Sequence, residues 1–314
     1  MRVALTGASG FIGSRTAARL AEAGHAVRAL VRSSSRRDHI EPHVAEFVEG
    51  PQDDGQALHR LVQGVDCVIH NSVDWQPLGG GGEEDPWRHY QSNLMGTLHL
   101  MEQARQAGVG QFVFVSSVAT HHEIVTTPTI TETHPTWPSG LYGAYKAAVE
   151  AHLKAYHHRY GLSTCAFRPA AVYGDDPVLE RNQWYRLITK AARGERISYS
   201  RGGKITHVDD VADALTLAVG DRGTAGELYN LVEGYLYGQR VAEVAREVSG
   251  SDASIEDKAG EGPANQFDRA KTLAFFERHG HTSALGGTED RVRAHVETVL
   301  RRVRDEKPGD LQGS

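Results

Sequence analysis

Short apolar runs alternate with amphipathic stretches along the first half of the chain. Each run is almost continuously hydrophobic, as is typical of a strand that is covered on both faces of a parallel sheet. The strands predicted in this way comprise residues 3–5, 25–32, 44–50, 65–70, 111–117 and 162–169. The helices predicted between them comprise residues 11–23, 55–62, 87–106 and 141–160. This alternation predicts an α/β fold with a doubly wound parallel sheet.

The alternation weakens after about residue 175, where glycine- and aspartate-rich connectors separate helices predicted at residues 272–280 and 289–306. We therefore expect two parts. Residues 1–174 form the first domain, and residues 203–232 return to it. The smaller C-terminal lobe, which would shape a substrate pocket, comprises residues 175–202 and 233–314.

The composition is that of a folded globular chain, with 39% hydrophobic and 24% charged residues. A formal net charge of −6 offers no basic surface for nucleic acid or an anionic membrane. No apolar run approaches the ~20 residues that cross a bilayer, and the residues before Thr6 are too few for a signal peptide. Cys67 and Cys165 suggest neither a disulfide framework nor a zinc site. We expect a cytoplasmic protein without a structural metal.

Glycines follow the first predicted strand directly and open the first predicted helix. A bare backbone there permits a tight turn and lets a pyrophosphate approach, and the last glycine lets the helix pack on the strand. The helix N-terminus adds free N–H groups and a partial positive charge. The Gly-x-x-Gly-x-x-Gly spacing therefore predicts a dinucleotide site of the Rossmann type, rather than a merely structural turn. The candidate contacts are Gly7, Ser9, Gly10, Phe11, Ile12 and Gly13.

Arg32 ends the second predicted strand, about 20 residues after the last of these glycines, where an acid usually reads the ribose of NAD. An arginine followed by the hydroxyl of Ser33 suits the 2′-phosphate of NADP instead. The alternative interpretation is a solvated polar loop. The sequence thus favours NADP over NAD.

Tyr142 and Lys146 lie four residues apart in a predicted helix, so they share one face. A phenol with its usual pKa of ~10 is a poor base at neutral pH. An ammonium at ~4 Å favours the phenolate by ~4 kcal/mol, which predicts a fall of the phenol's pKa before desolvation opposes it. Tyr142 is therefore the candidate acid/base. The neighbouring Tyr145 is interpreted as a packing aromatic.

Ser116 and Ser117 follow the apolar run F-V-F-V (112–115) and end the predicted strand, at the carboxyl edge of the predicted sheet. Ligands of open α/β folds bind at that edge. A hydroxyl there can hydrogen-bond a carbonyl oxygen and hold it beside the phenol. One of the two serines is expected only to cap the next segment.

Taken in order, these motifs resemble the extended short-chain dehydrogenases/reductases of the NAD(P)-dependent epimerase/dehydratase type. The similar segments run from residue 6 to residue 231 and appear in the family's order. They are T-G-A-S-G-F-I-G (6–13), V-D-C-V-I-H (65–70), N-L-M-G-T (93–97), F-V-F-V-S-S (112–117), Y-G-A-Y-K (142–146), R-P-A-A-V-Y-G (168–174), T-H-V-D-D-V-A (206–212) and G-E-L-Y-N-L (226–231).

The resemblance implies roles for particular residues. Ser117, rather than Ser116, would orient the carbonyl, Asn93 would belong to the active site, and Lys146 would also touch the nicotinamide ribose. Further implied cofactor contacts are Asn71, Ser72 and Val73 after the fourth strand, and Arg168, Pro169, Ala170 and Val172 beside the nicotinamide. After the third strand the chain departs from the family's Gly-Asp pattern, and Gln52 or Asp53 is expected to take the place of that Asp near the adenine. The candidate substrate contacts, which flank the predicted cleft, are Trp75 and Tyr173.

The implied activity is hydride transfer between C4 of a nicotinamide and a carbinol or ketone carbon of a small-molecule substrate. Nucleotide-sugar epimerisation is one outcome, and NADPH-dependent reduction of a ketone or aldehyde, as in flavonoid reductases and hydroxysteroid dehydrogenases, is the alternative. Arg32 favours net reduction, while the general resemblance to bacterial sugar epimerases favours epimerisation. The segment 117–120 lacks the acid that dehydratases usually carry, which disfavours dehydration. A non-catalytic dinucleotide-binding protein is disfavoured because Tyr142 and Lys146 are both present. A homodimer, common in that family, is left open.

Overall fold

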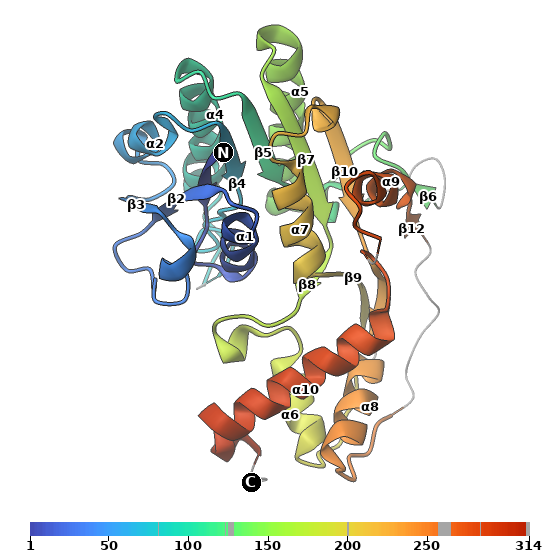
Figure 1. The fold of residues 1–314 in the computed structure, drawn as a ribbon. Helices are drawn as coiled ribbons and strands as arrows, with labels where there is room; N and C mark the ends of the chain where they lie inside the picture. The colour runs from blue at the N-terminus through green and yellow to red at the C-terminus, as the bar shows by residue number, and fades with distance from the viewer. Residues whose placement is uncertain are drawn as a thin grey trace.

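The computed structural model describes residues 1–80, 82–122, 124, 129–199, 201–256, 265–282 and 284–311. Its main feature is a seven-stranded sheet in which all neighbouring strands are parallel. The strands are β1 (Arg2–Thr6), β2 (Ala26–Val31), β3 (Glu46–Glu49), β4 (Cys67–His70), β5 (Gln111–Val115), β7 (Ser163–Pro169) and β10 (Glu227–Leu231). They lie in the order β10-β7-β5-β4-β1-β2-β3 (Figure 1). The predicted α/β class with a doubly wound parallel sheet is confirmed.

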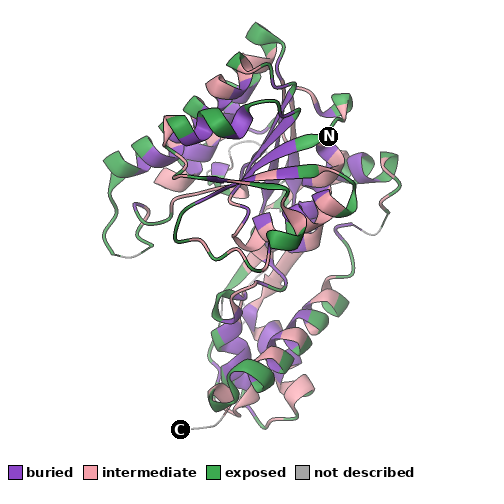
Figure 2. Ribbon diagram, turned by 60° about the vertical axis from the view of Figure 1, so that its left-hand side comes forward, coloured by how far each residue is buried: buried purple, intermediate pink, exposed green. Residues whose placement is uncertain are grey.

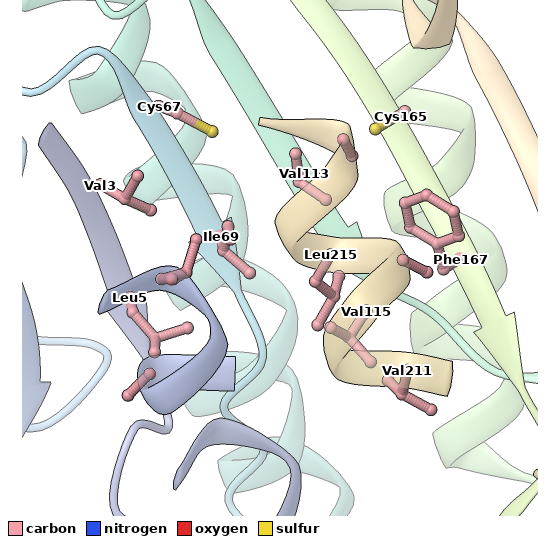
Figure 3. Close-up of a cluster of buried hydrophobic side chains, with 14 of the residues drawn as sticks. Val3, Leu5, Cys67, Ile69, Val113, Val115, Cys165, Phe167, Val211 and Leu215 are labelled. Atoms are coloured by element: carbon pink, nitrogen blue, oxygen red, sulfur yellow. The ribbon is translucent and has the colours of Figure 1, made fainter. Parts of the chain in front are cut away.

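Helices cover both faces of this sheet, because successive side chains of a strand point to opposite sides. On one face Val3 and Leu5 of β1 share a core with Leu215, which Figure 3 shows on the helix in front of the strands. On the other face Ala4 joins a second core. The helices of the first face are α1 (Phe11–Glu22), α7 (Val208–Ala218) and α9 (Ala270–Arg278), and those of the second are α2 (Gly55–Val62), α4 (Gly96–Gln106) and α5 (Leu141–Tyr160).

The helix predicted at residues 87–106 is interrupted. It begins as α3 (Pro86–His89), continues as a π-helix over Tyr90–Met95, and ends as α4. Turns of this wider kind are frequent at functional sites. A Cβ atom at Gly96, directly after the π-helix, would lie 2.9 Å from the carbonyl oxygen of Gln52. The irregular turn therefore brings this helix against the segment that follows β3.

A smaller lobe with its own core extends from the main sheet (Figure 1). Three of its strands form a separate sheet, and Tyr173, Ile188, Val241 and Val296 are buried together beside it. The apolar pattern does not predict most of these elements, since their strands are short and largely half-buried. They are β8 (Ala171–Tyr173), β9 (Gly202–His207), β11 (Gly234–Tyr237), α6 (Tyr185–Ala192), α8 (Gly238–Ser249) and α10 (Thr288–Glu306).

The domain boundaries given above stay a prediction. Within the range 233–314, α9 packs on β10 and places Phe275 in the core of the main sheet. Figure 2 shows the strands of that sheet buried at the centre and the outward helix faces exposed. The thiols of Cys67 and Cys165 are free and buried. In the part of the chain that the structure describes, no helix is long and apolar enough to cross a membrane.

Replacing Phe275 by alanine tests the packing of α9 on the sheet. The Phe275 side chain is fully buried, and its ring centroid lies 5.5 Å from that of Phe167 and 5.2 Å from that of Tyr229. The cavity left by Phe275→Ala should lower the free energy of unfolding by about 3–5 kcal/mol, measured by urea denaturation. Leu273→Ala on the same helix is the control, because Leu273 is 40% exposed and should cost less than about 1 kcal/mol. Equal losses for both variants would contradict this packing.

Candidate active site

The turn between β1 and α1 is built by glycines. Gly7 has a φ of 70°, a conformation that side chains rarely adopt, and its carbonyl oxygen accepts a hydrogen bond of 3.0 Å from the N–H of Gly10. A Cβ atom on Gly13 would fall 2.0 Å from that same oxygen. The turn therefore needs glycine at position 7 for its backbone and at position 13 for helix packing.

The residues of this turn have the donors that a dinucleotide phosphate needs. Helix α1 starts at Phe11 without a side-chain cap, so its first N–H groups are available to an anion. The segment after β4 lies over Gly7, since a Cβ there would approach Cα of Ser72 to 3.0 Å. Thr6 fixes this segment, because its hydroxyl accepts from the N–H groups of Asn71 and Ser72, both at 3.1 Å. The buried Oγ of Ser72 has no hydrogen-bond partner among the described residues.

Tyr142 and Lys146 lie on the first turns of α5, where the helix passes the end of β5. The buried Nζ of Lys146 donates a 2.6 Å hydrogen bond to the carbonyl oxygen of Val115. It lies 5.5 Å from the ring centroid of Tyr142 and 4.4 Å from that of Phe114. Tyr145 points elsewhere: its buried hydroxyl is 3.2 Å from Oγ1 of Thr97, in agreement with a packing role.

Burial controls the protonation of both groups. It raises the pKa of Tyr142 to about 12, although a hydrogen bond with Ser117 opposes the rise. Burial also lowers the pKa of Lys146 to about 7, against the attraction of the Glu150 carboxylate. The predicted fall of the phenol's pKa is therefore wrong for this structure, because the ammonium is held at the Val115 carbonyl and desolvation dominates. Tyr142 keeps its proton at neutral pH and can donate it.

The two serines after β5 face different partners. Ser117 caps a short 3-10 helix, since its Oγ accepts from the N–H of Ala119 at 3.1 Å, and the same side chain hydrogen-bonds Tyr142. Ser116 is buried and donates to Oε1 of Glu150 at 2.6 Å. The structure thus places Ser117 beside the phenol and assigns Ser116 to the interior.

Arg168 does not meet the cofactor pocket as the resemblance implied. Its guanidinium is 1% exposed and forms two hydrogen bonds with the buried carboxylate of Glu150, at 2.8 and 2.6 Å. A third contact, from Nη1 to Nε2 of His121 at 3.2 Å, requires that nitrogen to be unprotonated. The other His121 nitrogen then donates to the carbonyl oxygen of Pro135 at 3.1 Å. Burial and the neighbouring guanidinium lower the pKa of His121 to about 4, so the ring is neutral.

Asn93 is fully buried, and all four of its side-chain hydrogen-bonding positions are occupied within the protein. Its Oδ1 accepts from Nε2 of Gln52 at 2.8 Å and from the N–H of Asp74 at 2.7 Å. Its Nδ2 donates to the carbonyl oxygen of Asp74 and to Nδ1 of His89, both at 2.9 Å. The side chain therefore positions the loop after β4 and leaves no group for a substrate.

The residues expected at the adenosine are mostly exposed, and of their side chains only that of Gln52 is held by described side chains or backbone. The side chain of Gln52 is held by Ser92 and Asn93 through its Nε2, while its buried Oε1 has no hydrogen-bond partner within the described ranges. Asp53 is exposed. Arg32 and Ser33, which follow β2, are also exposed to an approaching ligand.

The two candidate substrate contacts differ. Trp75 is 55% exposed, and its ring centroid lies 5.0 Å from that of Tyr142. Tyr173, in contrast, is fully buried in the smaller lobe, where its hydroxyl donates to the carboxylate of Glu233 at 3.0 Å and its ring packs against Trp184. The expectation of a substrate contact at Tyr173 is therefore wrong, because the inward-facing register of β8 turns this side chain into the core.

A cavity of about 770 Å³ lies beside Tyr142 and Lys146 and reaches Ile12 at the start of α1. Its lining includes ten residues that the sequence proposed: Ile12, Asn71, Val73, Trp75, Ser117, Tyr142, Lys146, Pro169, Ala170 and Val172. The lining also includes residues that the sequence analysis did not assign to the site: His121, His122, Ile124, Ile130, Gln183, Lys204, Asn265 and Phe267. The described residues contain no cluster of histidine, cysteine, aspartate or glutamate arranged for a metal ion.

Comparison with known proteins agrees with this architecture. Residues 3–231 match the model of the NAD dependent epimerase/dehydratase family. The chain is 29% identical over 298 residues to a UDP-glucose 4-epimerase of Corynebacterium glutamicum, with 88% of each chain covered. It is also 29% identical over 240 residues to a farnesyl-dihydroquinoline-oxide ketoreductase of Stigmatella aurantiaca, covering 74% of this chain and 69% of that one.

Among solved structures, the fold is similar to that of a UDP-glucose 4-epimerase of Thermotoga maritima. The TM-score is 0.77 at 23% sequence identity, and the match covers 97% of this chain and 100% of the other. At this identity the similarity concerns the fold alone.

Replacing Arg168 by methionine tests the buried ion pair behind the site. The variant leaves the Glu150 carboxylate buried without its main partner, so Arg168→Met should lower the free energy of unfolding by about 3–5 kcal/mol in urea denaturation. Arg105→Met is the control, since the pair of Arg105 with Glu102 is about one-third exposed and should be worth about 1 kcal/mol or less. If Arg168→Met is as stable as the control variant, the pair does not hold the site together.

Proposed function

The chain belongs to the NAD dependent epimerase/dehydratase family, and on that premise we propose that this enzyme interconverts a carbinol and a ketone at Tyr142. The observation that carries the proposal is the convergence of Tyr142, Ser117 and Lys146 on one cavity that also reaches Ile12 at the glycine turn. A dinucleotide on that turn and a small substrate beside Tyr142 would share this cavity.

The protein's part of the reaction is proton transfer and orientation. Bound NAD(P) supplies or takes up the hydride at C4 of its nicotinamide, as the carbonyl carbon is reduced or the carbinol carbon oxidised. The hydroxyl of Tyr142, which burial keeps protonated, donates its proton to the substrate oxygen in the reducing direction. Ser117, hydrogen-bonded to the same phenol, would hold that oxygen in place. Lys146, fixed at the Val115 carbonyl, would donate a further hydrogen bond to the nicotinamide ribose.

For the cofactor, we propose a preference for NADP over NAD. Three arginines follow β2, and two of them already have carboxylate partners: Arg36 pairs with Asp38 at 2.9 Å, and Arg37 with Glu49 at 2.5 Å. Arg32 has no ion pair within the described residues, so its guanidinium is available to a 2′-phosphate. At the other end of the adenosine, the unpartnered Oε1 of Gln52 would accept from the adenine amino group.

For the substrate, two classes compete. Relatives named UDP-glucose 4-epimerase favour a nucleotide sugar. The cavity favours the second class, a ketone or its carbinol, because its described lining contains no arginine, aspartate or glutamate and is rich in apolar side chains. The homodimer and the cytoplasmic location expected from the sequence stay predictions.

Replacing Tyr142 by phenylalanine tests the acid/base role. Turnover of a panel of UDP-sugars and aromatic or aliphatic ketones should fall by about 10²–10⁴-fold, because the proton donor is lost. Fluorescence titration should show that NADPH still binds. Tyr145→Phe, three residues along the same helix, is the control and should keep turnover within a factor of about three, since its hydroxyl contacts only Thr97 among the described residues. Unchanged turnover in Tyr142→Phe would contradict the proposed function.

Replacing Arg32 by alanine tests cofactor choice. The dissociation constant for NADPH should rise by about tenfold or more, because a charged hydrogen bond to the 2′-phosphate is lost, while that for NADH stays the same. Arg36→Ala should change neither value, since its guanidinium is engaged by Asp38. An equal loss of affinity for both cofactors, or a wild-type preference for NADH, would contradict the role of Arg32.

A further inference from the structure

A second lysine, Lys204 of β9, lines the same cavity as Tyr142 and Lys146 but takes no part in the proton transfer. The residue is half-buried, and its Nζ donates a 2.7 Å hydrogen bond to Oδ1 of Asn265 and lies 5.4 Å from the ring centroid of Phe267. An ammonium has three protons to donate, and Asn265 accepts one of them. This group is therefore held in place at the cavity wall with donors to spare.

The charge of Lys204 is not balanced by the protein in the part that the structure describes. Its one described hydrogen-bond partner, the Asn265 amide, is neutral, and the described lining of the cavity contains no carboxylate. Burial lowers the pKa of Lys204 with no described carboxylate opposing the fall. Because charges that leave water are normally paired, an anionic group on a ligand would complete this site.

The number of cations limits the charge of that ligand. Lys146 lies behind Tyr142, where it would contact the nicotinamide ribose, so Lys204 is the one lysine or arginine left for a substrate among the described lining residues. A diphosphate carries a charge on each phosphate, and proteins commonly bind such groups with arginine forks. The described lining has no arginine. A single carboxylate matches a single ammonium better than a diphosphate does.

The walls of the cavity suit an apolar ring. Phe267 of β12 (Gln266–Phe267) is paired in register with Ile130 of β6 (Thr129–Ile130), and both side chains line the cavity. Trp75 lies against Tyr142 and contributes a further aromatic surface. Aromatic side chains of this kind pack well against a ring or an aliphatic body.

We propose that Lys204, held by Asn265, is the subsite for the carboxylate of a ring-bearing ketone or carbinol that reacts at Tyr142. The proposal rests on the proposed hydride transfer and narrows its substrate to singly charged, largely apolar molecules. Lys204 recognises this substrate and does not act in the chemical step.

A matched pair of probes tests the subsite. Phenylpyruvate and phenylacetone share a benzyl ketone and differ in a carboxylate against a methyl group. Each is titrated calorimetrically into the protein saturated with NADP⁺. The oxidised cofactor has no hydride to give, so neither ketone can be reduced. Phenylpyruvate should bind about tenfold or more tightly than phenylacetone, because only it can pair with Lys204. UDP-glucose should bind more weakly than phenylpyruvate.

Variants of Lys204 test whether this residue causes the difference in affinity between phenylpyruvate and phenylacetone. Lys204→Met should abolish the preference for phenylpyruvate and leave the affinity for phenylacetone unchanged, which also shows that the pocket is intact. Lys204→Arg should keep most of the preference, because the charge is retained. Lys190→Met is the matched control: Lys190 is exposed on α6, and its loss should change nothing.

Several results would overturn the subsite. One is that phenylpyruvate does not bind. Another is that the preference for phenylpyruvate over phenylacetone survives Lys204→Met. A third is that UDP-glucose binds more tightly than phenylpyruvate. Tyr142→Phe distinguishes failure of the subsite from failure of the proposed function. This variant should still bind phenylpyruvate with the wild-type preference over phenylacetone. Turnover that persists in Tyr142→Phe would overturn the hydride-transfer proposal and leave the carboxylate subsite standing.

Discussion

The candidate active site depends on the buried ion pair between Glu150 of α5 and Arg168 of β7. The pair ties the helix that carries Tyr142 to the sheet, and the same carboxylate accepts from Ser116 at the end of β5. Glu150 lies one turn beyond Lys146, so its position also sets that of the lysine. Because two charges are buried together, their separation would leave an uncompensated charge in the core. The geometry of the proton donor is therefore fixed by interactions outside the cavity.

The same burial explains the protonation of the site. Desolvation disfavours the phenolate of Tyr142 and the ammonium of Lys146 alike, so it acts on the two groups in opposite pKa directions. A phenol that retains its proton is suited to donate it to a carbonyl oxygen, which is the reducing direction. In an exposed tyrosine–lysine pair with the same spacing the desolvation cost would be smaller. The attraction of the ammonium would then lower the pKa of the phenol. Burial thus favours the reducing direction. Arg32 favours the same direction, because it is proposed to bind the 2′-phosphate of NADP.

The sequence predicts those parts of the site whose residues act through local spacing. The glycines at 7, 10 and 13 belong to one turn, and Tyr142 and Lys146 to one helix face, so periodicity and motif suffice for both. Arg168 was misassigned because its partner, Glu150, lies on another element, and only the packing of α5 on β7 brings them together. The sequence did not indicate Lys204 as a site residue, since the wall around it is formed by β12 and β6, which are distant from it in sequence.

Asn93 shows how an irregular element links the segment after β3 to the loop after β4. The π-helix carries this buried side chain to a point where one oxygen accepts from both Gln52 and Asp74. Gln52 belongs to the segment proposed to meet adenine, and Asp74 directly precedes Trp75 at the substrate end. A shift of either segment would break a hydrogen bond to a fully buried amide, which is costly to leave unsatisfied. The cofactor loop and the aromatic wall are therefore held at a fixed relative position by one side chain that need not touch either ligand.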